Sequence, residues 1–188
     1  KSAIIATGGL SRPETGSTGD ALSWLAELGH TIETPKAALV PVAVKETSIA
    51  KRLSGVALGL AGINLRQDGV VFEKAKGKVL FTHVGLSGPG ILNLSRRIGE
   101  GLANGAVEIL LDLTPDHAKD TLEELLLERF IASPNKHIQN QWTDIIPGAL
   151  VVPVLEQALI DPHTPSDSVT VAMRRQLVSV IKAFVFTA

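Results

Sequence analysis

The sequence contains no cysteine and no tyrosine, and each absence removes a class of function. Without cysteine the chain cannot form disulfides, thiolate metal sites or a cysteine nucleophile. Aromatic residues make up 4% of the chain and leave few side chains on which nucleic-acid bases could stack. Lysine and arginine (18) nearly balance aspartate and glutamate (19), and this composition lacks the basic excess that is typical of nucleic-acid-binding proteins. We therefore expect no nucleic-acid partner, although composition alone says nothing about a local basic patch.

Long apolar runs are also missing. No run approaches the roughly 18 residues of a membrane-spanning helix, and one of the longest, 149–155, is interrupted by Pro153. The first residues do not have the pattern of a signal peptide. We expect a cytoplasmic protein with no membrane partner, and 188 residues with 45% hydrophobic side chains are enough to form a buried core.

The first 35 residues are predicted to form a strand, a glycine-rich loop and a helix. Residues 2–6 are a continuous apolar run, as in a buried strand. Leucines at helical spacing follow the loop, and Gly29 is placed to end the helix. A second apolar run lies at 184–186. Since isolated strands need partners, both runs are expected to belong to a larger sheet.

Residues 36–113 are predicted to be mainly strands. The apolar runs are separated by glycine, aspartate and lysine turn signals, and they cover 38–44, 56–65, 69–73, 78–82 and 107–113. Asp68-Gly69 and Lys76-Gly77 are the predicted hairpin turns. A helix is expected after Pro89. The pattern favours a β-barrel-like domain.

Residues 114–183 are predicted to form a small helical bundle. Thr114-Pro115-Asp116 has the pattern of a helix start, with proline in the first turn. Further helices are expected at 136–146, 149–160 and 166–182. Residues 184–188 would then be a strand returning to another part of the protein. The predicted fold class is therefore α+β, a β-barrel-like domain followed by a small helical bundle.

The segment 6–20 has the richest chemistry. Its glycines allow a ligand to approach the backbone closely. Ser17 and Thr18 precede a helix, whose free N–H groups favour an anion, although the same pattern also fits an ordinary capped loop. No G-x-G-x-x-G dinucleotide fingerprint is present.

Two blocks of sequence resemble a known family. A-T-G-G at 6–9 followed by S-x-P-x-T-G-S-T-G-D at 11–20, and L-F-T-H-V-G-L-S-G-P at 80–89, are similar to the bacterial BaiN/YhiN-like flavoproteins, also called aminoacetone-oxidase-like. Leu10, Arg12 and Ala21 depart from the family pattern. The first block is also similar to fumarate-reductase-type flavoproteins, in which both elements lie against FAD.

The resemblance implies a function and a set of cofactor-binding residues. The whole protein would be an FAD-dependent oxidoreductase with NAD(P)H as electron donor and a small molecule, or oxygen, as acceptor. In this family a barrel-like and helical region is inserted into a Rossmann-like FAD domain. Residues 1–35 would thus be part of that FAD domain, and 36–113 and 114–183 would be the insert. The FAD contacts would come from these residues: Ala6, Thr7, Gly8, Gly9, Gly16, Ser17, Thr18, Gly19 and Asp20.

The resemblance also implies that parts of the enzyme are missing. Such proteins begin with a dinucleotide-binding unit and end with another FAD-contacting segment, and neither lies within these residues. The chain is therefore expected to be a middle fragment, inactive by itself, whose partners include the remaining FAD-domain segments of the same protein.

The second block contains a histidine and a serine. The resemblance implies that His83 lies on the substrate side of the flavin, and the alternative is an exposed loop histidine. A nucleophilic role for Ser87 would need a G-x-S-x-G elbow, which the sequence lacks at its last position. No catalytic acid or base is predicted.

Other clusters are weaker. Asp112, Asp116 and His117 are interpreted as a helix start, so no metal site is predicted. The basic doublets at 96–97 and 174–175 are interpreted as solvated helix faces, and the two tryptophans, Trp24 and Trp142, as packing residues. Two alternatives to the flavoprotein stay open, namely a stand-alone binding module for RNA or a protein and a serine hydrolase.

Overall fold

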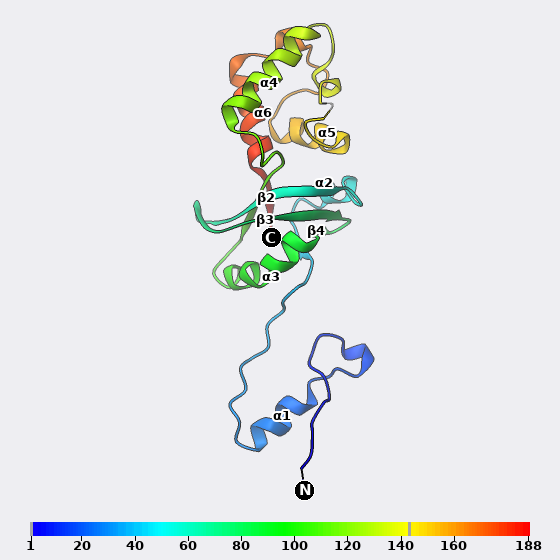
Figure 1. Cartoon of the computed structure of the whole chain (residues 1–188), viewed down its shortest axis with the longest axis vertical. Helices are drawn as coiled ribbons and strands as arrows, with labels where there is room; N and C mark the ends of the chain where they lie inside the picture. Colours follow the sequence, from blue (N-terminus) through cyan, green and yellow to red (C-terminus); the bar gives the residue numbers. More distant parts are fainter. Residues whose placement is uncertain (1, 143) are drawn as a thin grey trace. The chain divides into compact units, whose positions relative to one another are not determined.

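The computed structural model describes residues 2–142 and 144–188, and the chain divides into two compact units, Lys1–Ala37 and Ala38–Ala188 (Figure 1). The division lies close to the boundary predicted after residue 35. None of the described helices is long and apolar enough to cross a membrane.

The first unit holds a loop and a helix. A single 3-10 turn, η1 (Pro13–Thr15), precedes α1 (Asp20–Glu27), and α1 ends as predicted near Gly29, which has a φ of 91°. The strand predicted at residues 2–6 does not form within this unit. A strand needs a hydrogen-bonded neighbour, and the described part of the unit has none to offer.

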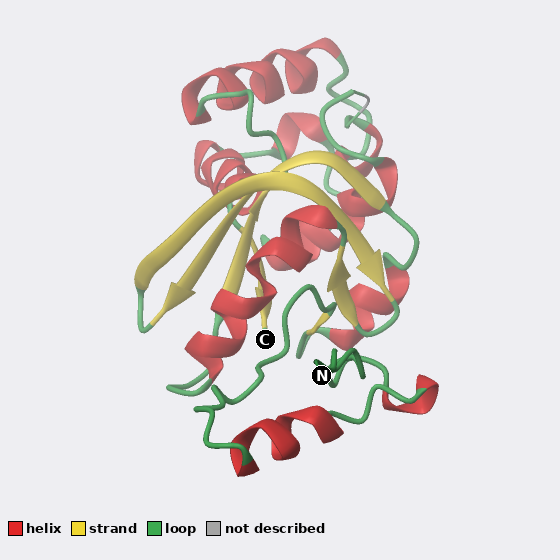
Figure 2. Cartoon of the chain, turned by 60° about the horizontal axis from the view of Figure 1, so that its bottom comes forward, coloured by secondary structure: helices red, strands yellow, loops and turns green. Residues whose placement is uncertain are grey.

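The second unit is built on a six-stranded antiparallel sheet in the order β1-β4-β3-β2-β5-β6. Its strands are β1 (Val42–Ala43), β2 (Ala57–Gln67), β3 (Val70–Thr82), β4 (Gly85–Ser87), β5 (Glu108–Asp112) and β6 (Phe184–Thr187). The sheet curls, and its two long strands arch over a helix (Figure 2). The two ends of the sheet meet where the Lys45 amide, just beyond β1, donates to the Thr187 carbonyl at 2.8 Å. The predicted barrel-like domain is confirmed.

Of the two predicted hairpins, one is confirmed and one is wrong. Asp68 and Gly69 join β2 to β3 with φ angles of 51° and 80°, as a tight two-residue hairpin turn requires. Gly77, in contrast, lies in the middle of β3. A Cβ there would lie 2.7 Å from the Cα of Gly90, in the helix under the arch. Gly77 therefore allows close packing and does not form a turn.

The helices of this unit are α2 (Thr47–Arg52), α3 (Pro89–Leu102), α4 (Lys119–Ala132), α5 (Gly148–Gln157) and α6 (Val171–Lys182), with 3-10 turns η2 (Ile138–Asn140) and η3 (Ser166–Ser168). The helix expected after Pro89 is confirmed as α3. The sequence pattern did not predict α2.

Two helix predictions fail for tertiary reasons. The helix predicted from Thr114 begins at Lys119, because the Asp112 carboxylate accepts the Thr114 amide and holds a turn there. The helix predicted at 136–146 is reduced to η2. The Ile138 amide donates to the carbonyl of Thr164 at 2.9 Å and not to a preceding helical turn. Contact with this distant segment therefore replaces the helical hydrogen bonds.

Strand β6 belongs to the same sheet, so its prediction as a strand returning to another domain is wrong. It pairs with β5, and Phe184 and Phe186 are fully buried. The outer edge of β6 is covered by side chains. The amide of Gln157 both donates to and accepts from the backbone of Val185, at 3.0 Å each. The last strand is therefore an integral part of the barrel.

One buried apolar cluster extends through the barrel and the helices that follow it, from Val42 to Phe186. Strand β5 ends at Asp112, and α4, the first long helix of the helical part, begins at Lys119. Since the two parts share this core, they form one compact unit.

Candidate functional site

The glycine-rich loop brings its two sequence elements together. A Cβ on Gly8 would lie 3.0 Å from the hydroxyl of Ser17, and the side chain of Leu10 lies directly against Gly19. Residues 6–9 and 16–20 are therefore neighbours within the first unit. Gly8, Gly16 and Gly19 have φ angles of 77°, 91° and 81°, which residues with side chains rarely adopt.

The loop leaves its backbone accessible. Among the predicted cofactor-binding residues, all are exposed except Ser17 and Gly19, which are half-buried. A Cβ at Gly9 or Gly16 would meet nothing within 4 Å. This open backbone, with hydroxyl and carboxylate groups beside it, fits a ligand such as FAD, which carries many hydroxyl groups.

Asp20 does not cap helix α1. The N-cap of α1 is Gly19, and no side chain caps the helix. The Asp20 carboxylate instead accepts a hydrogen bond from the Thr18 hydroxyl at 2.9 Å. A carboxylate in the first helical turn disfavours a phosphate there by like-charge repulsion, whereas it readily accepts hydrogen bonds from hydroxyl groups.

The second block, 80–89, forms the turn between β3 and β4 and the start of α3. The Thr82 hydroxyl closes the turn by accepting from the Gly85 amide at 3.2 Å. A Cβ on Gly85 would collide with the carbonyl of Val42. Much of this motif is therefore explained by close backbone packing.

His83 and Ser87 are not joined in this turn. His83 is exposed, Ser87 is half-buried in β4, and neither side chain makes a hydrogen bond within the described part of the chain. The arrangement gives no support to a serine nucleophile activated by this histidine, since the two would have to be hydrogen-bonded. An exposed His83 remains free to meet a substrate.

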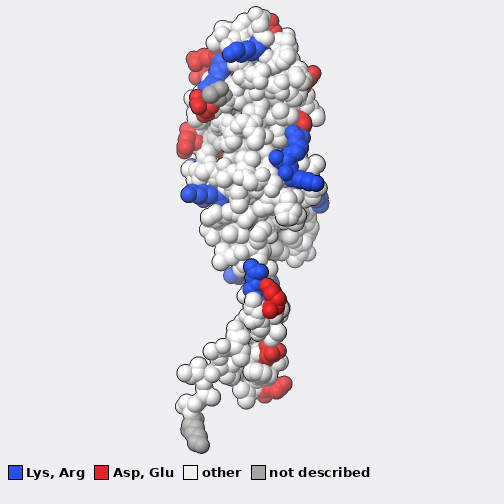
Figure 3. All heavy atoms as spheres, turned by 90° about the vertical axis from the view of Figure 1, so that its right-hand side faces the viewer, with Lys and Arg blue, Asp and Glu red and all other residues white. Residues whose placement is uncertain are grey.

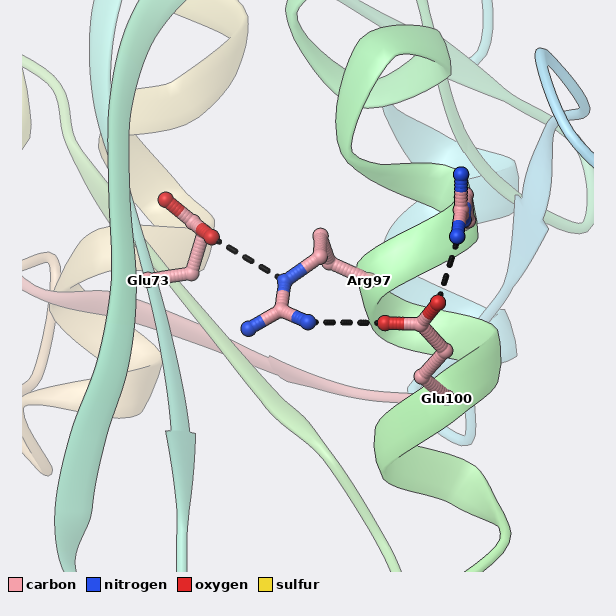
Figure 4. A network of polar contacts seen from close by, with 4 residues as sticks. Glu73, Arg97 and Glu100 are labelled. Carbon is pink, nitrogen blue, oxygen red and sulfur yellow. Dashed lines mark hydrogen bonds and ion pairs between the residues drawn. The ribbon is translucent and has the colours of Figure 1, made fainter.

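The arginine doublets form ion pairs. Arg97 donates to Glu73 of β3 at 3.1 Å and to Glu100 at 2.7 Å (Figure 4). Glu100 also accepts a hydrogen bond from Arg96 at 3.0 Å. The bond from Arg97 and, to a smaller extent, that from Arg96 lower the pKa of Glu100. Arg174 is nearly buried and pairs with Glu123 at 3.3 Å. Arg97 and Arg174 therefore connect elements, whereas Arg96 and Arg175 are 71% and 72% exposed.

Asp112 is a connecting residue. The Lys182 ammonium lies 2.6 Å from its carboxylate and donates to the carbonyls of Thr114 and His117 at 2.9 and 2.7 Å. Within the described residues, no group of three or more histidine, aspartate or glutamate side chains could hold a metal ion. The sequence pattern gave no sign of the contact with Lys182, because the residues are far apart in the chain.

The two tryptophans differ. Trp142 is buried, as expected of a packing residue, whereas Trp24 on α1 is 46% exposed within its unit. The prediction of a packing role for Trp24 is therefore not met within residues 2–37.

Residues 36–188 match the sequence model of a family described as "HI0933-like protein barrel and H2TH domain". The chain belongs to the HI0933-like, or BaiN/YhiN, family of FAD-dependent oxidoreductases. The match starts one residue after the predicted end of the first region and covers the barrel and the helical part.

Three curated relatives extend the similarity. A Haemophilus influenzae protein named ribosomal RNA dihydrouridine synthase is 31% identical over 188 residues, 100% of this chain and 43% of the relative. A Clostridium scindens 3-dehydro-bile acid delta(4,6)-reductase is 27% identical over 187 residues, covering 98% and 45%. An Escherichia coli ribosomal RNA dihydrouridine synthase is 31% identical over 150 residues, covering 79% and 34%. The HI0933-like chain thus spans less than half the length of these relatives.

Proposed function

We propose that the protein to which this HI0933-like chain belongs reduces a carbon–carbon double bond conjugated with a carbonyl, using NAD(P)H as donor and FAD as carrier. The observation that carries the proposal is the similarity along nearly the whole chain to proteins with two different printed activities. Formation of dihydrouridine and reduction at delta(4,6) both describe the addition of hydrogen to such a double bond. The shared reaction is therefore a better guide than either substrate.

The proposed reaction balances as a two-electron reduction. One carbon of the double bond receives a hydride and the other a proton from a general acid or water, while NAD(P)H becomes NAD(P)⁺. Bound FAD would relay the hydride between nicotinamide and acceptor. No residue of this chain is assigned as the general acid.

The contribution of this chain would be to hold part of the cofactor. Residues 6–9 and 16–20 are neighbours with open backbone, and the Asp20 carboxylate is positioned to accept hydrogen bonds from ribityl or ribose hydroxyls. The barrel and helical part would then shape access of the acceptor, with His83 as the exposed candidate on that side.

The reaction is tested on the complete protein. We expect anaerobic NAD(P)H oxidation that depends on added acceptor, either a uridine-containing ribosomal RNA or a conjugated 3-oxo steroid acid, with a product that has gained two hydrogens. Mass spectrometry of the product and nicotinamide absorbance are the measurements. Residues 1–188 by themselves should be inactive. Oxidation that proceeds only with oxygen, and leaves both acceptors unchanged, would overturn the proposal.

The role of Asp20 is tested by Asp20→Asn in the complete protein. Asparagine can still accept from Thr18, but it loses the charge. A lost charge-assisted bond of about 1.5–3 kcal/mol would raise the FAD dissociation constant roughly 10- to 150-fold, as measured by titrating apoprotein. Glu14→Gln, in the same loop, removes an exposed acid whose one ion pair among the described residues is with Arg12, and it should leave the affinity unchanged. Equal FAD affinity in the two variants would rule out the cofactor role.

A further inference from the structure

Three lysines form a row on one face of β3. Lys74, Lys76 and Lys78 occupy alternate positions of the strand, and all three are exposed. Successive side chains of a strand point to opposite faces, so the three lie on the same face, about 7 Å apart along the strand. We call them the lysine row.

The intervening residues identify that face as the outer one. Glu73 pairs with Arg97 of α3, Gly77 lies against Gly90 of the same helix, and Val79 is buried. Helix α3 lies under the arch of the long strands (Figure 2). The lysine row therefore projects from the convex side of the sheet, away from α3.

No acid neutralises the row within the described part of the chain. Glu73, the one acid of β3, points to the opposite face (Figure 4). Two strands away, Glu108 is paired with Arg66 at 2.6 Å, and this hydrogen bond lowers the pKa of Glu108. Asp112 is likewise paired with Lys182. The row is thus locally basic although the whole chain carries −1 and both signs of charge are interspersed on the face shown in Figure 3.

The neighbouring strand β2 adds few side chains beside the row. Gly62 lies opposite Lys76, and Asn64 lies opposite Lys74. The Asp112 side chain, which is paired with Lys182, lies over Gly62, because a Cβ on Gly62 would be 3.0 Å from the Cβ of Asp112. Leu60 and Leu80, near the end of the row, are 47% and 37% exposed. The exposed part of this face is therefore the strip of β3 that carries the three lysines.

We propose that the lysine row binds the sugar–phosphate backbone of an RNA acceptor. This inference rests on the proposed function, in the form in which the reduced double bond is that of a uridine in RNA. Evenly spaced cations along one strand match the regular charges of a nucleic-acid strand, and the Asn64 amide adds a hydrogen-bonding group beside them. The proposal departs from the expectation, drawn from overall charge, that the protein has no nucleic-acid partner.

The kind of recognition also follows. Phe81, Phe184 and Phe186 are fully buried, and the chain has no tyrosine, so this face offers no stacking platform. Contacts from lysine to phosphate position a nucleic acid without reading its sequence. Binding at the row should therefore depend on salt and be indifferent to base sequence.

The test compares two triple variants of the 188-residue chain. The row variant is Lys74→Gln, Lys76→Gln and Lys78→Gln; the matched control is Lys36→Gln, Lys119→Gln and Lys136→Gln. The control lysines are also exposed, and they have no ion pair within the described residues. Binding of a fluorescein-labelled RNA stem–loop is followed by anisotropy at several sodium chloride concentrations, and melting curves check that both variants fold.

We expect the row variant to bind at least about tenfold more weakly at low salt. The slope of log affinity against log salt should become shallower by about 2, since each lost phosphate contact on a single strand contributes about 0.7. The control variant should keep the wild-type slope.

Equal losses in the two triple variants, or no RNA binding by the wild-type chain, would each overturn the lysine row as an RNA surface. None of these results depends on FAD or on reduction. The proposed function is tested separately. The row variant of the complete protein should still reduce a conjugated steroid acid. If the wild-type protein does not reduce this acid, the result contradicts the proposed reaction and leaves the lysine row untouched.

Discussion

Replacing Phe186 with alanine is expected to lower the free energy of unfolding by about 3–5 kcal/mol. The ring is fully buried, 5.7 Å from that of Phe81 and 5.0 Å from that of Phe184. Its removal loses apolar burial and leaves a cavity between strands that the barrel holds rigidly. Since small proteins are typically stable by about 5–15 kcal/mol, this single change removes a large part of the total. Urea unfolding followed by circular dichroism measures it.

Val185→Ala is the matched control. Val185 precedes Phe186 on the same strand, faces the opposite side and is only half-buried. Its truncation should cost about 1 kcal/mol. If both variants lose the same stability, β6 does not have the register with β5 that places Phe186 in the core.

Replacing Lys182 with methionine is expected to cost about 3 kcal/mol. Its ammonium pairs with Asp112 and donates to two backbone carbonyls, and only 12% of its side chain is exposed. Methionine retains most of the apolar stem. The loss of stability therefore comes from three acceptors that lose the lysine as a donor, namely the Asp112 carboxylate and the carbonyls of Thr114 and His117. Thermal or urea unfolding is the measurement.

Two further variants make this result specific. Lys119→Met removes an exposed lysine at the start of α4 and should change stability by less than about 0.5 kcal/mol. Asp112→Asn combined with Lys182→Met should cost less than the sum of the single changes, since the two residues interact directly. Strict additivity would contradict the contact.

Local signals in the sequence were enough for much of the barrel. Asp68-Gly69 predicted a hairpin because two residues with positive φ are needed in so tight a turn, and Pro89 predicted the start of α3. The failures involve distant residues. Gly77 looks like a turn residue, but its role depends on Gly90, and the stretch from residue 136 follows the backbone near Thr164. Such contacts leave no local signal.

The candidate site was predicted in the same uneven way. The glycines of the loop indicated where a ligand could approach, and the structure places residues 6–9 beside 16–20. The hydrogen bond between Thr18 and Asp20 was not predicted, because aspartate before a helix also fits a cap. The lysine row was missed, since near-zero total charge hides three like charges on one face of a strand. The signal was present as lysine at every second position.

The position of β6 in the sheet has a consequence for folding. Strand β6 pairs with β5, but α4, α5 and α6 all lie between the two strands in sequence. The barrel can therefore gain its last strand only after the helical part has become compact and brought the chain back. Pairings between residues so distant in sequence close late and slow folding. We expect the hairpin of β2 and β3 to form early. In hydrogen-exchange labelling during refolding, the amides of β6 should become protected last.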